Sequence, residues 1–412
     1  MKSEVKRRLR GVRVPGVYPL VRGAYGLSRS LRRAIVRRSA GARPYTLIQS
    51  SERRHILCGY YGASPFSPSN AELLLVQSTD ASLYRAPDPT QRMHVSVIEW
   101  RTGRSVAELG FTSAWNWQQG CRALWLPDGR CVYNVYDDRS RRYSARIVDV
   151  EAGTAYEVPF PVQEVASTGE LYSISYAALA ATRRDYGYFC RPVVEADLRD
   201  AGLVSFSANS TTSAELVACR DLKEDAEGRH ASRLHSYRIN HVLANPSGNK
   251  LVFLFRYSTD VVERTISDVI VYDLQRKSWD VVWEDSGVSH YTWMDDESLL
   301  LTGVHRGQFG YCTLSLGVGR VEMVRRMTDG HPVWLAPPKF ITDSYPDQFG
   351  VRHLWLASVD GSEWESLGEF VEPWYLWGER RCDLHPSVSG DRRYWQVDMV
   401  AAGRRSIAIG EL

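Results

Sequence analysis

The sequence has no apolar run of about 18 residues, the length that a membrane-spanning helix requires, so we expect no transmembrane segment. The N-terminal residues also lack the apolar core of a secretory signal peptide. The seven cysteines are odd in number and contain no C-x-x-C pair, so neither a disulfide framework nor a thiolate zinc site is indicated. Together these absences favour a reduced, cytoplasmic chain.

Several common enzyme motifs are missing as well. The sequence contains neither the phosphate-binding pattern GxxxxGK[ST] nor the dinucleotide pattern GxGxxG. It also lacks the HExxH motif of zinc proteases and the GxSxG motif of hydrolases. Nucleotide-dependent glycosyl transfer therefore finds no support in the sequence.

The net charge of +3 conceals an uneven distribution. Residues 1–43 carry 13 Lys and Arg against one Glu, a local charge of +12 that leaves −9 for the rest of the chain. The acidic remainder gives no support for nucleic-acid binding. We define residues 1–45 as a basic leader and residues 46–412 as the body.

Within the leader, Leu27, Leu31 and Ile35 recur at the spacing of one helical face, among arginines. This pattern predicts a short basic amphipathic helix, which through residues 1–43 could lie on the anionic inner face of a membrane. The alternatives are a leader that packs on the body, or on nothing, and a mitochondrial transit peptide. Under the first hypothesis the protein is peripheral on the inner membrane face.

The body has the composition of an all-β protein. It is rich in aromatic residues, with 13 Trp and 22 Tyr in the chain, and aromatic side chains pack well on pleated sheets. Short β-rich runs alternate with turn signals such as PDG at 127–129 and PSGN at 246–249. A unit of roughly 50 residues, typical of one propeller blade, can be followed through residues 241–283 and 385–412. The sequence therefore predicts a single β-propeller, of about seven blades, with six or eight also possible. Residues 165–235 fit the plan less well and predict a helical or loop insertion.

Four histidines recur at intervals close to one blade. His241, His290, His331 and His385 are separated by 49, 41 and 54 residues, and each stands before an apolar run. Residues at equivalent places in successive blades lie near the same end of the central channel. The four imidazoles are therefore expected to converge in one pocket. The alternative is that each is an isolated histidine in a turn.

Several stretches of the body resemble, in order, a family of propeller proteins encoded in bacterial polysaccharide gene clusters. The matching stretches are WNWQQGCRALWLPDG (115–129), INHVLANPSGNKLVFLFRY (239–257), VSHYTWMDD (288–296), DGHPVW (329–334), ITDSYPD (341–347) and RCDLHPSVSGD (381–391). That family is related to seven-bladed oligogalacturonate and ulvan lyases. The resemblance covers about residues 55–412 and implies a lyase that acts by β-elimination on a uronate-containing oligosaccharide or polysaccharide.

The chemistry implied by the resemblance needs a base for the C5 proton, an acid for the leaving oxygen and a positive group at the uronate carboxylate. His241 matches the base, and a neutral imidazole suits that role. His290, His331 and His385 match positions that could bind a divalent cation such as Mn, Fe, Ni or Zn. Arg256 could pair with a carboxylate, and Tyr345 is a candidate acid.

Further residues could hold the glycan itself. Asn116, Gln118 and Gln119 could bind sugar hydroxyls, and Trp117 could stack on a sugar ring. Arg381 flanks His385 together with Asp383, which could orient an imidazole. For each of these residues a structural role in packing, in an ion pair or in a turn is the alternative.

Some positions depart from the family pattern. Phe255 and Ser387 stand where related sequences have a histidine and a basic residue, and no H-x-H pair follows His331. These departures keep a second hypothesis open. In it the chain is a non-catalytic glycan-binding or scaffold protein of capsule or exopolysaccharide biosynthesis.

Overall fold

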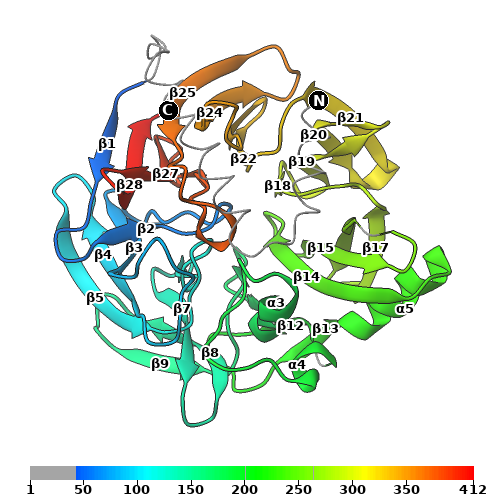
Figure 1. Ribbon diagram of the computed structural model, residues 1–412, viewed down its shortest axis with the longest axis horizontal. Coiled ribbons are helices and arrows are strands. Elements are labelled where there is room, and N and C mark those ends of the chain that lie inside the picture. The colour runs from blue at the N-terminus through cyan, green and yellow to red at the C-terminus, as the bar shows by residue number, and fades with distance from the viewer. Residues whose placement is uncertain (1–42, 200, 263) are drawn as a thin grey trace, which may run out of the picture.

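The computed structural model describes residues 43–199, 201–262 and 264–412 and shows a β-propeller. Seven four-stranded antiparallel sheets surround a central axis (Figure 1). The predicted seven-bladed, all-β fold is therefore confirmed. The predicted amphipathic helix of the leader lies outside the described residues.

The first four blades, each given from its inner to its outer strand, use consecutive strands. They are β2(His55–Leu57), β3(Leu73–Thr79), β4(Met93–Glu99) and β5(Arg104–Thr112); β6(Leu124–Trp125), β7(Cys131–Asp137), β8(Arg142–Val148) and β9(Ala155–Val158); β10(Glu164–Val165), β11(Leu171–Ser173), β12(Gly202–Phe206) and β13(Ala214–Ala218); and β14(Leu234–Ala244), β15(Lys250–Thr259), β16(Ile266–Asp273) and β17(Ser278–Trp283). Blades 5 to 7 follow, and only the last one combines both ends of the body. They are β18(Tyr291–Trp293), β19(Ser298–His305), β20(Gln308–Ser315) and β21(Arg320–Arg326); β22(Val333–Ala336), β23(Lys339–Asp343), β24(Val351–Ser358) and β25(Trp364–Val371); and β26(Ser387–Val388), β27(Tyr394–Ala401), β28(Arg404–Glu411) and β1(Tyr45–Ile48).

The ring is closed by strand pairing between segments far apart in sequence. The first described strand, β1, adds to the outer edge of β28, with Thr46 opposite Ile409. Ile48 at the end of β1 is buried in a cluster with Ile407 and Tyr394. Closure thus joins the start of the body to its end by both hydrogen bonds and apolar packing.

Burial explains the apolar runs seen in the sequence. The second strand of blade 4, β15, reads KLVFLFRYST and is buried on both faces, because each blade is packed between two neighbours. A strand buried on both faces reads as a continuous apolar run rather than as an alternating one. The outer strand β17, SWDVVW, is only partly buried along its whole length.

The stretch 165–235 contains the predicted insertion and also most of blade 3. Helices α3(Tyr176–Thr182) and α4(Glu195–Arg199) lie between strands β11 and β12, and α5(Cys219–His230) connects β13 to β14 (Figure 1). Two short 3-10 turns, η1(Leu316–Val318) and η2(Gly378–Arg380), complete the described elements. None of the helices in the described ranges is long and apolar enough to span a membrane.

Candidate functional site

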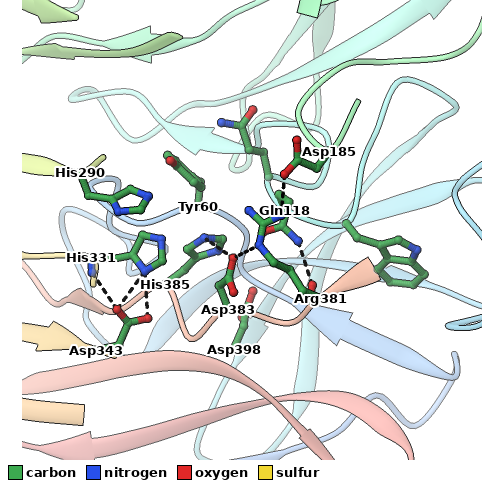
Figure 2. Close-up of polar contacts among 12 residues, drawn as sticks. Tyr60, Gln118, Asp185, His290, His331, Asp343, Arg381, Asp383, His385 and Asp398 are labelled. Atoms are coloured by element: carbon green, nitrogen blue, oxygen red, sulfur yellow. Dashed lines mark hydrogen bonds and ion pairs between the residues drawn. The ribbon is translucent and has the colours of Figure 1, made fainter. Parts of the chain in front are cut away.

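The four histidines from different blades meet at one end of the central channel. His290, His331 and His385 directly precede the inner strands β18, β22 and β26. The ring centroids are 4.0 Å apart for His290 and His331, 4.6 Å for His331 and His385, and 5.4 Å for His241 and His290. Figure 2 shows His290, His331 and His385 side by side.

His241 reaches the cluster in a different way from the one expected. It lies within β14 rather than before it, at a bulge in the pairing with β15 between Asn240 and Leu243. Its φ is +59°, and that of His385 is +46°. Left-handed backbone is uncommon outside glycine and concentrates at functional sites, where surrounding contacts hold it in place. Eight other non-glycine residues of the described chain also have positive φ, so the backbone conformation agrees with the side-chain geometry at these two positions but does not define the site alone.

The ring of His331 is fixed by a carboxylate. Its Nδ1 lies 2.9 Å and 3.0 Å from the two carboxylate oxygens of Asp343, at the end of β23 (Figure 2). The backbone N–H of His331 donates to the same carboxylate over 2.7 Å. Because the carboxylate accepts from Nδ1, the lone pair is left on Nε2, which is buried and has no hydrogen-bond partner among the described residues.

His385 has the same arrangement with a backbone acceptor. Its Nδ1 donates to the carbonyl oxygen of Gly59 over 3.0 Å, and its buried Nε2 makes no hydrogen bond within the described part of the chain. That Nε2 lies 3.9 Å from a carboxylate oxygen of Asp383. One potential ligand atom from each of His331, Asp383 and His385 lies within 4.8 Å of the others. Two imidazole nitrogen atoms without a hydrogen-bond partner among the described residues, together with a carboxylate, are a donor set that suits a divalent transition metal.

His290 belongs to the imidazole cluster but not to this group of three ligand atoms. Its Nδ1 lies 3.1 Å from Asp329, which also accepts from the Thr302 hydroxyl over 2.7 Å. Burial and the neighbouring His331 lower the pKa of His290 to about 4, so the ring is neutral at physiological pH. Asp383 thus takes the place in the candidate metal group that the sequence analysis gave to His290.

Two tyrosines that the sequence analysis did not single out complete the centre. Tyr60 and Tyr61 follow β2 in the segment GYYGA, and the Tyr60 hydroxyl is hydrogen-bonded to the ring of His241. The Tyr60 ring lies 4.8 Å from His385, and the Tyr61 ring lies 5.0 Å from His331. The only signal in the sequence was a pair of aromatic residues between two glycines.

The predicted catalytic residues lie around the cluster. Burial, with the nearby charge of Arg256 as the next cause, holds the pKa of His241 well below its usual value. Arg256 is buried and donates to the carbonyl oxygens of Val288 and Ser289 over 3.1 Å and 3.2 Å. The ring of Tyr345 lies 6.0 Å from that of His331. His241 is thus part of the histidine cluster, and Arg256 and Tyr345 lie close to it. The catalytic roles of all three residues stay predictions.

Arg381 is engaged by two acids. Its Nε donates to Asp383 over 2.5 Å, and its Nη1 pairs with Asp185 (Figure 2). Arg352 binds the other oxygen of Asp383 over 2.7 Å. Burial alone would raise the pKa of Asp383, but Arg381 and Arg352 hold it well below its usual value. In this arrangement Arg381 fixes Asp383, and its predicted contact with a glycan is untested.

The residues of the NWQQG segment form a buried turn. The side-chain oxygen of Asn116 accepts from the backbone N–H groups of Gln118 and Gln119 over 3.0 Å and 2.8 Å. Gln118 donates to the carbonyl oxygen of Arg381 over 2.8 Å, and Trp117 is 1% exposed. Both glutamine Oε1 atoms are buried without a partner among the described residues. The segment ties blade 2 to the loop that carries Arg381, while its predicted role in sugar binding is neither shown nor excluded.

Comparison with known proteins supports the fold and little beyond it. No protein-family model and no curated protein matches the chain. Among solved structures, an oligogalacturonate lyase in complex with manganese is 12% identical, with a TM-score of 0.61, over 91% of this chain and 98% of that one. The β-propeller domain of the Trilobed protease from Pyrococcus furiosus is 10% identical (TM-score 0.52, 85% and 94% covered). A puromycin-hydrolyzing peptidase of Mycobacterium tuberculosis is 12% identical (TM-score 0.52, 90% and 55% covered). These likenesses show a β-propeller, and the assignment to polysaccharide gene clusters gains no support from them.

Proposed function

We propose that this chain is a metal-dependent lyase that cleaves a uronate-containing glycan by β-elimination. The observation that carries the proposal is the pair of buried Nε2 atoms on His331 and His385, which lie beside the carboxylate of Asp383 and have no hydrogen-bond partner among the described residues. If the two histidines had only a structural role, these nitrogen atoms would destabilise the fold, because buried polar groups are normally hydrogen-bonded. The likeness to an oligogalacturonate lyase that binds manganese adds a precedent for the fold.

A divalent cation of the Mn, Fe, Ni or Zn type, held by His331, His385 and Asp383, would neutralise the uronate carboxylate. His290 lies beside His331 and is a further candidate ligand. Arg256 would add a second positive group at the same carboxylate.

Proton transfer is assigned to residues outside the candidate metal group. His241 is neutral because of its lowered pKa, so it can accept the C5 proton as a general base. The Tyr60 hydroxyl, bonded to the His241 ring, and the Tyr345 hydroxyl are the two candidates for protonating the leaving oxygen. The raised pKa of Tyr345, caused by burial and then by the charge of Asp383, keeps its proton available for donation.

The test begins with metal-stripped full-length protein. Mn, Ni or Zn is restored, and polygalacturonate, alginate, ulvan and hyaluronan are followed by the ultraviolet absorbance of the unsaturated product. We expect product from at least one glycan and only with metal present. His331→Ala and His385→Ala should each abolish stoichiometric metal binding and product formation.

His235→Ala is the matched control, because the His235 side chain is 59% exposed and lies outside the cluster. It should retain both metal and activity. Full metal content in His331→Ala, or no product from any glycan with any metal, would overturn the proposal.

The burial of the site favours a second candidate function. The four imidazoles are between 0% and 5% exposed, and Tyr60 covers His241. A site closed in this way also fits a glycan-binding or scaffold protein of capsule or exopolysaccharide assembly, attached to the inner membrane face through residues 1–43. Glycan binding without product, together with liposome co-sedimentation that is lost when residues 1–43 are removed, would support this candidate over the lyase.

A further inference from the structure

Two arginines lie side by side next to the histidine cluster without an acidic partner. Arg238 on β14 and Arg256 on β15 are opposite each other in the strand pairing, so both side chains stand on the same face of blade 4. Their residues are 8% and 6% exposed. The Nε atoms of both are buried and have no hydrogen-bond partner among the described residues, and the side chain of Arg238 makes no hydrogen bond or ion pair with any residue that the structure describes.

The nearest charged groups do not neutralise this pair. Asp185 is bound to Arg183 over 2.8 Å and also to Arg381. Asp329 is hydrogen-bonded to the neutral ring of His290, so its single negative charge acts on Arg256 but is not paired with either arginine. Arg183 lies close to both arginines and adds a further positive charge. Among the described residues, the Arg256 side chain donates only to backbone carbonyl oxygens. The charged side chains around Arg238 and Arg256 therefore leave a net positive charge in a buried part of blade 4.

Such an arrangement is costly unless something neutralises it. Burying an ionised group without a partner is unfavourable, and like charges directly opposite each other in a sheet repel. Burial and the charge of Arg256 lower the pKa of Arg238 to about 9, which still leaves it protonated at neutral pH. A guanidinium fork binds carboxylate and phosphate oxygens with two parallel hydrogen bonds, which makes an oxyanion the fitting counter-charge.

We propose that Arg238 and Arg256 form a binding site for an oxyanion, adjacent to His241. The ligand is a carboxylate or a phosphate group, because both offer a pair of anionic oxygen atoms at the spacing that a guanidinium binds with two hydrogen bonds. Arg256 also takes part in the proposed lyase reaction, whereas Arg238 has no role in it. Binding at this pair requires neither metal nor turnover, so the site can be tested whether or not the lyase proposal holds.

The experiment uses metal-free full-length protein in HEPES buffer with chloride as the only other small anion. Inorganic phosphate, D-galacturonate and the neutral sugar D-galactose are titrated separately, by calorimetry and by thermal denaturation. We expect phosphate or galacturonate to bind and to raise the melting temperature, and galactose to do neither. Stronger binding of phosphate would identify a free or lipid-borne phosphate as the ligand. Stronger binding of galacturonate would identify the glycan carboxylate.

Arg238→Met tests the site directly, since it keeps most of the apolar length and removes the charge. It should weaken anion binding by at least about tenfold, the effect of losing one charge-assisted hydrogen bond. Without added anion it should melt at the same temperature as the wild type or higher, because an unneutralised buried charge has been removed. A purely structural arginine would instead give a lower melting temperature.

Arg264→Met is the matched control. Arg264 is 60% exposed and is paired with Asp285. It should keep the full anion response. The proposal would be overturned if neither anion bound the wild type, or if Arg238→Met bound anion as tightly as Arg264→Met did. If the wild type bound anion and Arg238→Met bound it more weakly, but the wild type showed no lyase activity, only the lyase proposal would be contradicted.

Discussion

The Nδ1 atom of His331 lies 2.9 Å from the Oδ1 atom of Asp343, and neither side chain is exposed to solvent. This contact fixes both the orientation of the imidazole and the position of its proton. It leaves the lone pair on Nε2, and one possible ligand atom of His331 lies within 4.8 Å of those of His385 and Asp383, the other members of the candidate metal group. A carboxylate behind an imidazole in this way also raises the basicity of the ligand nitrogen.

Asp343→Asn should weaken metal binding without unfolding the protein. The amide oxygen can still accept from Nδ1, but the negative charge is lost, and changes of this kind lower metal affinity by roughly 10-fold to 100-fold. Calorimetric titration with Mn measures the effect. Asp280→Asn is the control, since Asp280 is 60% exposed and lies on the outer strand β17. Equal affinity of the two variants would exclude an orienting role for Asp343.

Tyr60→Phe should slow the proposed reaction while leaving metal binding intact. The substitution removes the hydroxyl that is bonded to His241 and keeps the ring that packs on His385. If this hydroxyl transfers a proton, kcat should fall by about 100-fold or more, with little change in KM. Tyr84→Phe, at a residue that is 62% exposed, provides the comparison. An unchanged kcat would assign the acid role to Tyr345.

Asp398 predicts a specific dependence of stability on pH. It is buried, accepts from the backbone N–H groups of Cys58 and Gly59 over 2.8 Å and 3.1 Å, and burial raises its pKa to about 7. The folded-state pKa is thus above the unfolded value of about 3.9. The contribution of Asp398 to the free energy of unfolding is therefore fully present below about pH 4 and is lost as pH rises through about 7.

Asp398→Asn should remove that loss. Denaturant unfolding at about pH 5 and about pH 8 should show the free energy of unfolding of the wild type falling relative to that of the variant by at most about 3 kcal/mol, because about two pH units separate pH 5 from the folded-state pKa. Groups such as Glu164, whose pKa burial also raises to about 7, are present in both proteins and cancel in the difference. A difference between the two proteins that does not change with pH would contradict this prediction.

Closure of the ring by β1 can be tested with two adjacent residues. Ile48→Ala removes a side chain that is 5% exposed and should lower the free energy of unfolding by about 2–3 kcal/mol. Leu47→Ala removes one that is 43% exposed and should change it by less than about 0.5 kcal/mol. Similar effects of the two substitutions in denaturant unfolding would mean that β1 contributes little to closure.

Much of the fold could be predicted because the repeat is local. Each blade has its own turns and apolar strands, so a period of roughly 50 residues and a count of about seven follow from pattern alone, and the structure decided between six, seven and eight. The same period placed His290, His331 and His385 at equivalent points in three blades. His241 was predicted to precede its strand, and this was wrong, because a bulge within β14 lets the strand continue past it.

The sequence by itself determined the all-β repeat and the spacing of the histidines, since both depend on residues close together along the chain. Only the tertiary structure decided which groups those histidines contact. Tyr60 reaches His241 across 181 residues, and Gly59 meets His385 across 326. These relations arise when the closed ring brings distant blades to one axis, and no local pattern in the chain records them.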